Sequence, residues 1–364
     1  QGTYVINTTG NDINTITLGG YNRYSQITTG TGDDIIKLEG SDSIDAAITS
    51  EGGNNTIEVM KDYAGTGYSP RITVTTGSGD DNITFGQLNN NTINAENGDN
   101  TITVSGMDNT ITTGSGKDTI TIGHTDNFRG NTVNIGAVSD SGIVTVQGGV
   151  ENAVTVKGGN YNKINIYNTQ KQSGKYNAIN IESGNVNTIN VLGGHTHIDL
   201  NGTHNHTITT GDGDDVITGV NGATIDAGDG NNNITVAGGY GINNITTGSG
   251  SDTITLYAGN TIRTGAGDDN ISILVADDDP NEGNYNPRIE AGQGNDTITI
   301  DDAFVQAVYL KFRKGDGHDT VTGNHNLSSG GIQVDVGTSE FIVRQNQEDS
   351  TSMDKIGRAS CRER

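Results

Sequence analysis

The chain has 364 residues, with 55 glycines, 3 prolines, no tryptophan and a formal net charge of -24. Only 30% of the residues are hydrophobic, which is thin for the core of a globular domain of this length but enough for a repeat fold with one narrow aliphatic stripe. The acidic charge disfavours nucleic-acid binding, and the sequence contains no apolar run of about 18 residues that could span a membrane.

Short strands are predicted from the beginning of the chain. Residues 1–58 hold degenerate coils, and between Ile83 and Ile120 aliphatic side chains recur every 9 to 10 residues in segments that alternate apolar and polar positions. Two such strands per coil predict an all-β fold, a right-handed parallel β-roll or β-solenoid with roughly 18–20 residues per coil. The isoleucines that mark these strands are Ile16, Ile27, Ile36, Ile44, Ile57, Ile83, Ile93, Ile102, Ile111 and Ile120.

A glycine-rich loop precedes every second strand. The stretch TGSGSD at 247–252 runs into the strand TITL, and the loop returns as TGAGDD at 264–269. Glycine permits positive φ, so the backbone can turn its carbonyls inward, and the aspartate closes the loop two residues before a core aliphatic. Because the loops occur on alternate half-turns, we expect them to line one edge of the roll. In-frame copies lie at 29–37, 76–84, 113–121, 210–218, 227–235, 247–255, 264–272, 291–299 and 314–322, with weaker copies at 50–58 and 95–103.

These loops match G-G-x-G-x-D-x-U-x and resemble the haemolysin-type calcium-binding repeat of the RTX (repeats-in-toxin) family. The resemblance implies a parallel β-roll in which several Ca²⁺ ions are shared between successive coils, and export by a type I secretion system. Ca²⁺ takes six or more oxygen ligands at about 2.3 to 2.6 Å, which carbonyls and a carboxylate can supply. Asn100 and Asn232 stand where the motif has aspartate, so we expect weaker sites there, because an amide carries no charge.

The expected calcium sites comprise the glycines and the closing Asp or Asn of each loop. The alternative is that these loops are plain turns, which Gly, Asn and Asp favour, but their in-frame repetition argues against it. The residues are Gly30, Gly32, Asp34, Gly77, Gly79, Asp81, Gly98, Asn100, Gly114, Gly116, Asp118, Gly211, Gly213, Asp215, Gly228, Gly230, Asn232, Gly248, Gly250, Asp252, Gly265, Gly267, Asp269, Gly292, Gly294, Asp296, Gly315, Gly317 and Asp319.

Asparagine replaces aspartate over much of the middle of the chain. Residues 124–209 keep the strand alternation (TVNI, INIY, INIE) but largely lack calcium-type loops, and an asparagine stands two residues before nearly every core aliphatic. Stacked amides can hydrogen-bond along a solenoid and satisfy turn backbone groups. The ladder comprises Asn91, Asn109, Asn131, Asn152, Asn162, Asn177, Asn187, Asn243 and Asn260, and its assignment to edges within 124–209 stays open.

The chain therefore divides into five predicted segments. Calcium-type coils occupy 1–123 and 210–323, and the asparagine-ladder coils lie between them at 124–209. Two loops, 60–70 and 276–287, both end in Tyr-x-Pro-Arg-Ile, and we interpret them as surface excursions. We predict that residues 324–355, which contain GIQVDVGTSEFIVRQNQEDS, form a capping β-hairpin. The segment is similar to the one that often follows the last repeat of the family. Residues 356–364, which hold Cys361, resemble a translated adapter sequence, and we interpret them as a non-native tail.

Other candidate sites are weaker. Lys157, Tyr161 and Lys163 form a basic patch that could bind an anionic polysaccharide, or simply a solvated face with local charge relief. The His-x-His pairs of 195–206 could hold Zn²⁺ or Cu²⁺, although His206 occupies a ladder position. An ice-binding row on the loops is disfavoured because its outward residues are irregular and charged. No catalytic motif is found, so we expect no enzymatic activity in this segment.

The sequence predicts a calcium-binding structural or adhesive β-roll segment of a secreted bacterial protein, extracellular or at the cell surface. Its mechanism would be metal-coupled folding: the acidic, glycine-rich chain stays unfolded where calcium is scarce and folds when calcium neutralises the loop carboxylates. The alternative is a carbohydrate-binding or targeting module of a secreted polysaccharide-active enzyme, whose catalytic domain would lie elsewhere.

Overall fold

The computed structural model is all-β and forms two compact units, Gln1–Leu192 and Gly193–Arg364. No helix is present among the described residues, and so none that could cross a membrane. The structure describes residues 3–19, 24–39, 45–60, 71–123, 130–136, 142–167, 174–201, 203–236, 241–257, 259–274, 286–301, 307–313, 315–323, 332–335, 341–345 and 359–363.

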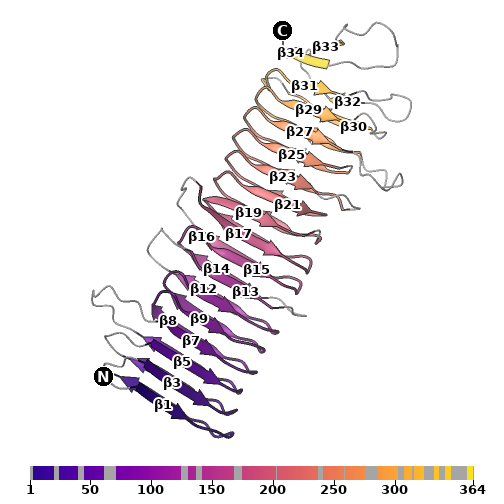
Figure 1. The fold of residues 1–364 in the computed structure, drawn as a ribbon. Coiled ribbons are helices and arrows are strands. Elements are labelled where there is room, and N and C mark those ends of the chain that lie inside the picture. Colours follow the sequence, from indigo (N-terminus) through magenta and orange to yellow (C-terminus); the bar gives the residue numbers. More distant parts are fainter. Residues whose placement is uncertain are drawn as a thin grey trace. The chain divides into compact units, whose positions relative to one another are not determined.

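In the first unit, odd-numbered strands form one parallel sheet and even-numbered strands form another (Figure 1). The odd strands are β1 (Thr3–Asn7), β3 (Tyr24–Thr29), β5 (Asp45–Ser50), β7 (Ile72–Thr75), β9 (Thr92–Asn94), β11 (Thr110–Thr112), β13 (Thr132–Ile135), β15 (Ala153–Val156) and β17 (Tyr176–Ile181). The even strands are β2 (Thr15–Gly19), β4 (Ile35–Glu39), β6 (Thr56–Met60), β8 (Asn82–Gln87), β10 (Thr101–Ser105), β12 (Thr119–Gly123), β14 (Ile143–Gln147), β16 (Lys163–Tyr167) and β18 (Thr188–Leu192).

The second unit repeats this arrangement. Its odd strands in the parallel sheet are β19 (His195–Asp199), β21 (Val216–Val220), β23 (Asn233–Val236), β25 (Thr253–Leu256), β27 (Asn270–Ile273), β29 (Thr297–Ile300) and β31 (Thr320–Thr322). Its even strands are β20 (Thr207–Thr209), β22 (Thr224–Asp226), β24 (Asn244–Thr246), β26 (Thr261–Arg263), β28 (Arg288–Glu290), β30 (Val308–Lys311) and β32 (Ile332–Asp335).

Each unit is thus a right-handed parallel β-solenoid, as the strand alternation predicts, with about 21 residues per turn. Coil length varies more than the expected 18–20 residues: Asp252 and Asp269 occupy equivalent positions 17 residues apart, whereas Asp269 and Asp296 are 27 apart. The longer step contains the predicted loop 276–287. Most of that loop and of 60–70 lies outside the described residues, as does Ile44.

The core is a row of aliphatic side chains that stack in register from coil to coil. Ile83, Ile102 and Ile120 are paired on neighbouring strands and are fully buried. In the second unit Ile254 and Ile271 are paired and buried in the same way. Parallel strands lie about 4.8 Å apart, so each of these isoleucines packs on an isoleucine or valine of the next coil. This stripe explains how a chain of low hydrophobic content folds.

Two described strands lie within the predicted capping segment 324–355, and a third lies beyond it. Strand β32 pairs in parallel with β30, so it continues the solenoid sheet, in keeping with the apolar-polar alternation of its sequence IQVD. Strand β33 (Phe341–Gln345) pairs antiparallel with β34 (Ala359–Glu363), which also pairs antiparallel with β31. The antiparallel pair therefore uses residues of 356–364, the segment that we interpret as a non-native tail.

Candidate cation sites on the loop edges

The motif aspartates of the first unit form a buried ladder on the edge that leads into the even-numbered strands. Asp34, Asp81 and Asp118 directly precede β4, β8 and β12, with Asn55 and Asn100 at the equivalent places between them, and all five side chains are buried. The backbone N–H of each of the first four along the chain donates to Oδ1 of the ladder residue on the next coil, at 2.8 to 3.1 Å. We call this row the acid ladder.

On the opposite edge of the first unit, the described ladder positions from Asn91 to Asn177 are asparagines. Asn91, Asn109, Asn131, Asn152 and Asn177 are linked by the same hydrogen bond, N–H to Oδ1 of the next coil, and they lead into odd-numbered strands. Farther along the acid-ladder edge, Gly142, Asn162 and Asn187 continue the row without a carboxylate. The edges that the sequence left open within 124–209 are therefore assigned for these residues.

In the second unit the acid ladder leads into the odd-numbered strands instead. It runs from Thr196 through Asp215, Asn232 and Asp252 by the same backbone-to-side-chain bonds, then through Asp269, Asp296 and Asp319. The amide row of this unit, which includes Asn243 and Asn260, leads into even-numbered strands. The sequence analysis did not foresee this change of strand parity between the units. Within each unit, the predicted alignment of the loops along one edge is confirmed.

The asparagines of the acid ladder reveal where the loop carbonyls converge. Asn100 Nδ2 donates to the carbonyl oxygens of Ala95 and Gly98 at 2.8 and 3.0 Å. Asn55 Nδ2 donates to the carbonyls of its own loop at Gly52 and Gly53, at 3.2 and 2.8 Å. Each loop therefore presents carbonyl oxygens to the second terminal atom of its ladder side chain, and an amide there satisfies them.

The aspartates present an oxygen where the asparagines present an amide. Their Oδ1 accepts the same backbone N–H, so Oδ2 occupies the position that Nδ2 takes in the asparagine loops. This Oδ2 is buried and accepts no well-formed hydrogen bond in Asp34, Asp81, Asp118, Asp215, Asp252, Asp269 and Asp296. A threonine hydroxyl of the same loop still favours the charged form of five of them and lowers its pKa: Thr76 for Asp81, Thr113 for Asp118, Thr210 for Asp215, Thr247 for Asp252 and Thr264 for Asp269. Leaving a buried carboxylate oxygen unpaired is costly, and facing it with carbonyl oxygens adds repulsion. Either a proton or a cation can satisfy this arrangement.

Burial raises the pKa of these carboxyl groups. It raises the pKa of Asp215 and Asp296 to about 7 and that of Asp269 to about 6. Hydrogen bonds from neighbouring residues oppose the rise, while the adjacent carboxylates of Asp269 and Asp319 raise the pKa of Asp296 further. Burial also raises the pKa values of Asp81, Asp118, Asp252 and Asp319. The ionised ladder therefore needs a compensating positive charge.

The motif glycines are required for two different reasons. Gly267 has a φ of 139°, and a Cβ on it would lie 1.9 Å from the carbonyl oxygen of Gly250. Gly265 has no positive φ, but a Cβ there would lie 2.0 Å from the carbonyl oxygen of Gly248. Gly265 is therefore required not for its φ but because close stacking of successive coils excludes a side chain there. The second glycine of the motif has a positive φ in eight loops, at Gly79, Gly98, Gly116, Gly230, Gly250, Gly267, Gly294 and Gly317.

A second, exposed ladder lies beside the buried one and was missed by sequence reasoning. Asp80 Oδ1 accepts the N–H of Asp99 at 2.7 Å, and Asp99 Oδ1 accepts the N–H of Lys117 at 2.7 Å. Asp268 Oδ1 accepts the N–H of Asn295 at 2.8 Å in the second unit. These bonds run in the opposite chain direction to those of the buried row. Paired acidic residues in the motif, such as Asp80 with Asp81, are the signal that could have revealed it.

No group of three or more His, Cys, Asp or Glu side chains that could hold a metal is found among the described residues. The histidines are consistent with this finding, since His206 is buried at a ladder position and its Nε2 lies 2.8 Å from Thr203 Oγ1. A cation on the acid ladder would thus be held by one or two carboxylates and several carbonyls. That all-oxygen donor set fits Ca²⁺.

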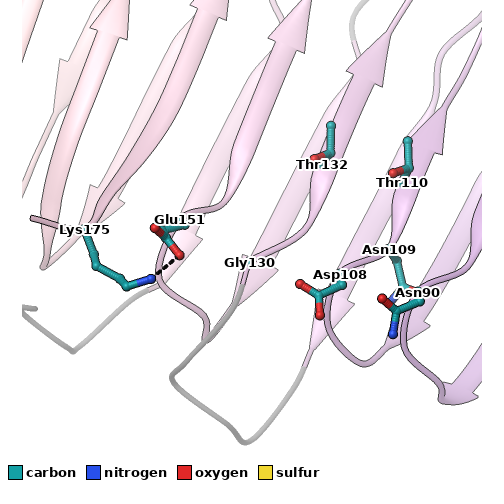
Figure 2. Close-up of a pocket in the computed structure, with 8 residues that line it drawn as sticks. All are labelled: Asn90, Asp108, Asn109, Thr110, Gly130, Thr132, Glu151 and Lys175. Atoms are coloured by element: carbon teal, nitrogen blue, oxygen red, sulfur yellow. Dashed lines mark hydrogen bonds and ion pairs between the residues drawn. The ribbon is translucent and has the colours of Figure 1, made fainter. Parts of the chain in front are cut away.

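The basic patch and a polar hollow occupy different turns of the first unit. Lys157, Tyr161 and Lys163 are exposed on the turn that leads into β16, and Tyr161 is 67% exposed with a φ of 62°. A hollow of about 630 Å³ lies beside the asparagine row (Figure 2), where Lys175 pairs with Glu151 at 2.5 Å. It is lined by Asn90, Asp108, Asn109, Thr110, Gly130, Thr132, Glu151 and Lys175, and this lining contains no aromatic side chain.

Comparison with known proteins gives one partial match. Residues 89–123 match the sequence model of a family described as "Protein of unknown function (DUF3060)". No curated protein matches the chain, and no solved structure matches it. The matched segment covers the coils from Asn91 to Asp118 and is compatible with a solenoid repeat, but its family carries no assigned function.

Proposed function

We propose that this protein is a structural β-solenoid segment whose acid ladders bind Ca²⁺, and that calcium stabilises or completes its fold outside the cell. The observation that carries the proposal is the buried, unpartnered Oδ2 of the ladder aspartates, which takes the place of an amide nitrogen in otherwise equivalent loops. A calcium ion between coils would bind both this oxygen and the loop carbonyls. In the asparagine loops the side-chain N–H groups satisfy those carbonyls instead.

The composition supports coupling of the metal to folding. A net charge of -24 and 55 glycines oppose compaction, through charge repulsion and backbone entropy. Binding to the folded state alone contributes about 2.7 kcal/mol per site when free calcium exceeds the dissociation constant about 100-fold. In a low-calcium cytosol the calcium-dependent coils would stay unfolded, which would keep the chain competent for export by a type I system, as the RTX resemblance implies. The segment would then act as a scaffold or adhesive stalk, without catalysis of its own.

Thermal unfolding of the full chain tests the proposal. We expect millimolar calcium to raise the melting temperature strongly and magnesium to raise it little, because Mg²⁺ gives up its water reluctantly and demands a stricter geometry. The calcium effect should shrink in Asp252→Asn but not in Asp212→Asn, since Asp212 is an exposed residue outside the ladder. Equal melting temperatures in calcium and in chelator would refute the proposal.

A carbohydrate-binding function is the second candidate, and the exposed Tyr161 between Lys157 and Lys163 favours it. An aromatic ring flanked by cations could stack on a sugar while the lysines pair with its carboxylates. Binding of an anionic polysaccharide such as alginate should then weaken in the Lys157→Ala, Lys163→Ala double variant. The control is Lys37→Ala, which removes a lysine paired with Glu58 at 2.8 Å. Unchanged binding in the double variant would exclude this patch.

A further inference from the structure

We call two acid-ladder residues on consecutive coils, joined by the N–H to Oδ1 hydrogen bond, a step of the ladder. The steps are of two chemical kinds, and the two kinds are distributed unequally between the units. In the first unit each carboxylate follows an asparagine. Asn14, Asn55 and Asn100 donate Nδ2 to Oδ1 of Asp34, Asp81 and Asp118, at 2.7, 2.9 and 3.1 Å. The amide therefore supplies the positive partial charge that bridges each of these steps.

In the second unit, consecutive coils bring carboxylates together without an intervening amide. Asp252 donates its N–H to Asp269 Oδ1 at 2.8 Å, Asp269 to Asp296 Oδ1 at 2.9 Å, and Asp296 to Asp319 Oδ1 at 3.1 Å. All four side chains are at most 3% exposed. For each of the last three, the ladder residue on the preceding coil is an aspartate, which has no side-chain N–H to donate. Oδ2 of Asp252, Asp269 and Asp296 lacks a partner.

We infer that the three steps Asp252–Asp269, Asp269–Asp296 and Asp296–Asp319 are the principal calcium sites, each taking one ion between two carboxylates and the loop carbonyls. Affinity for Ca²⁺ rises with the number of charged ligands. The first unit, whose steps pair a carboxylate with an amide, binds calcium weakly and folds without it. This inference rests on the proposed function and adds which half of the chain calcium controls.

The geometry of the asparagine loops supports the placement of the ions. Asn55 Nδ2 contacts two carbonyls of its own loop and also Asp81 Oδ1 of the next coil, at 2.9 Å. The equivalent point between Asp252 and Asp269 is therefore bordered by oxygen atoms from both coils. Shared ions also couple neighbouring coils, so we expect these three sites to fill cooperatively.

Isothermal titration of the full chain with CaCl₂, in excess MgCl₂, tests the inference. We expect three tightly bound ions, one for each Asp–Asp step. Asp269→Asn breaks two of these steps and should leave one ion, whereas Asp319→Asn should leave two. The matched control is Asp81→Asn in the first unit, which should leave three. Asparagine occurs naturally at the equivalent positions Asn55, Asn100 and Asn232, so these variants keep the ladder hydrogen bonds.

Hydrogen exchange followed by mass spectrometry gives an independent measurement by segment. In chelator, amides of β25, β27 and β29 should exchange fast and become protected with calcium, whereas those of β8, β10 and β12 should be protected in both conditions. Equal calcium protection of both units, or equal ion loss in Asp81→Asn and Asp269→Asn, would overturn the inference while leaving calcium binding intact. Absence of any calcium binding would overturn the proposed function as well.

Discussion

At the residue scale, one atom in each loop distinguishes the proposed cation sites from plain turns. In the asparagine loops Nδ2 satisfies the converging carbonyls, as at Asn100, whereas Oδ2 of the aspartates has no partner. The motif spacing predicted which residue closes each loop, because the position two before the core aliphatic recurs in frame. That an amide can fill the place of the proposed ion could not be predicted, since it depends on where the carbonyls of a folded loop point.

Exchange of one ladder carboxylate for an amide should raise the stability of the metal-free protein and lower the stability of the protein in calcium. In chelator we expect Asp296→Asn to stabilise the protein by about 1 to 3 kcal/mol, because a buried, unpaired charged oxygen is replaced by a donor to loop carbonyls. In calcium the same variant should be less stable than the parent, since two ion sites are lost. Chemical denaturation monitored by circular dichroism measures both effects. A variant that is less stable in chelator would contradict this interpretation of the ladder.

The pH dependence of the metal-free protein should follow from the raised pKa values. Those of Asp215, Asp269 and Asp296 are about 7, 6 and 7 in the folded state, above the ordinary value of 3.8. The folded state therefore binds more protons than the unfolded state between about pH 4 and 7, so this contribution to stability is present below pH 4 and is lost as the pH rises to 7. We expect the melting temperature in chelator to fall across this window.

The triple variant Asp215→Asn, Asp269→Asn, Asp296→Asn is the control for the pH measurement, and its melting temperature should vary less over the same range. With calcium present the trend should reverse, because the ion binds ionised carboxylates. A metal-free protein that gains stability between pH 4.5 and 7 would show that other groups dominate its titration.

At the element scale, the unit of construction is a loop followed by a short strand with one buried aliphatic. The period-two alternation and the isoleucine spacing predicted the strands well, because any other register would expose the stripe to water. Coil length was predicted less well, since insertions at turns lengthen a coil without changing the stacking, as between Asp269 and Asp296. The change of strand parity was also not predictable, because the degenerate turns of 124–209 give no sign of which edge they occupy.

The stacking of loops makes the motif glycines intolerant of substitution. In calcium we expect Gly267→Ala to destabilise the protein by about 3 kcal/mol, because its Cβ would lie 1.9 Å from the backbone carbonyl of Gly250 and its φ is 139°. Gly123→Ala is the matched control, since a Cβ there meets nothing within 4 Å. Thermal unfolding of the two variants provides the comparison. Equal melting temperatures would show that the loops can separate without cost.

At the scale of the whole molecule, stability is a sum over coils, and each coil contributes a thin core and two turns. The solenoid class follows from composition: few hydrophobic residues, many glycines and strong acidity exclude a thick core but suit a stack. The predicted segments 1–123, 124–209 and 210–323 stay predictions, and the structure's own division at Leu192 and Gly193 falls inside the middle one. The predicted cap at 324–355 also stays a prediction, because the alternation of β32 suits a further coil as well as a hairpin.

The most direct test of calcium-coupled folding is a far-ultraviolet circular dichroism titration of the full chain with calcium, with magnesium as the control. We expect a chelated protein with only part of its β signal, contributed by the amide-bridged first unit, and a cooperative gain of β signal with calcium alone. Asp252→Asn or Asp269→Asn should move the midpoint to higher calcium. A full β spectrum in chelator that calcium neither changes nor stabilises would contradict the proposal, and would leave the aliphatic stripe and the amide rows as the only determinants of the fold.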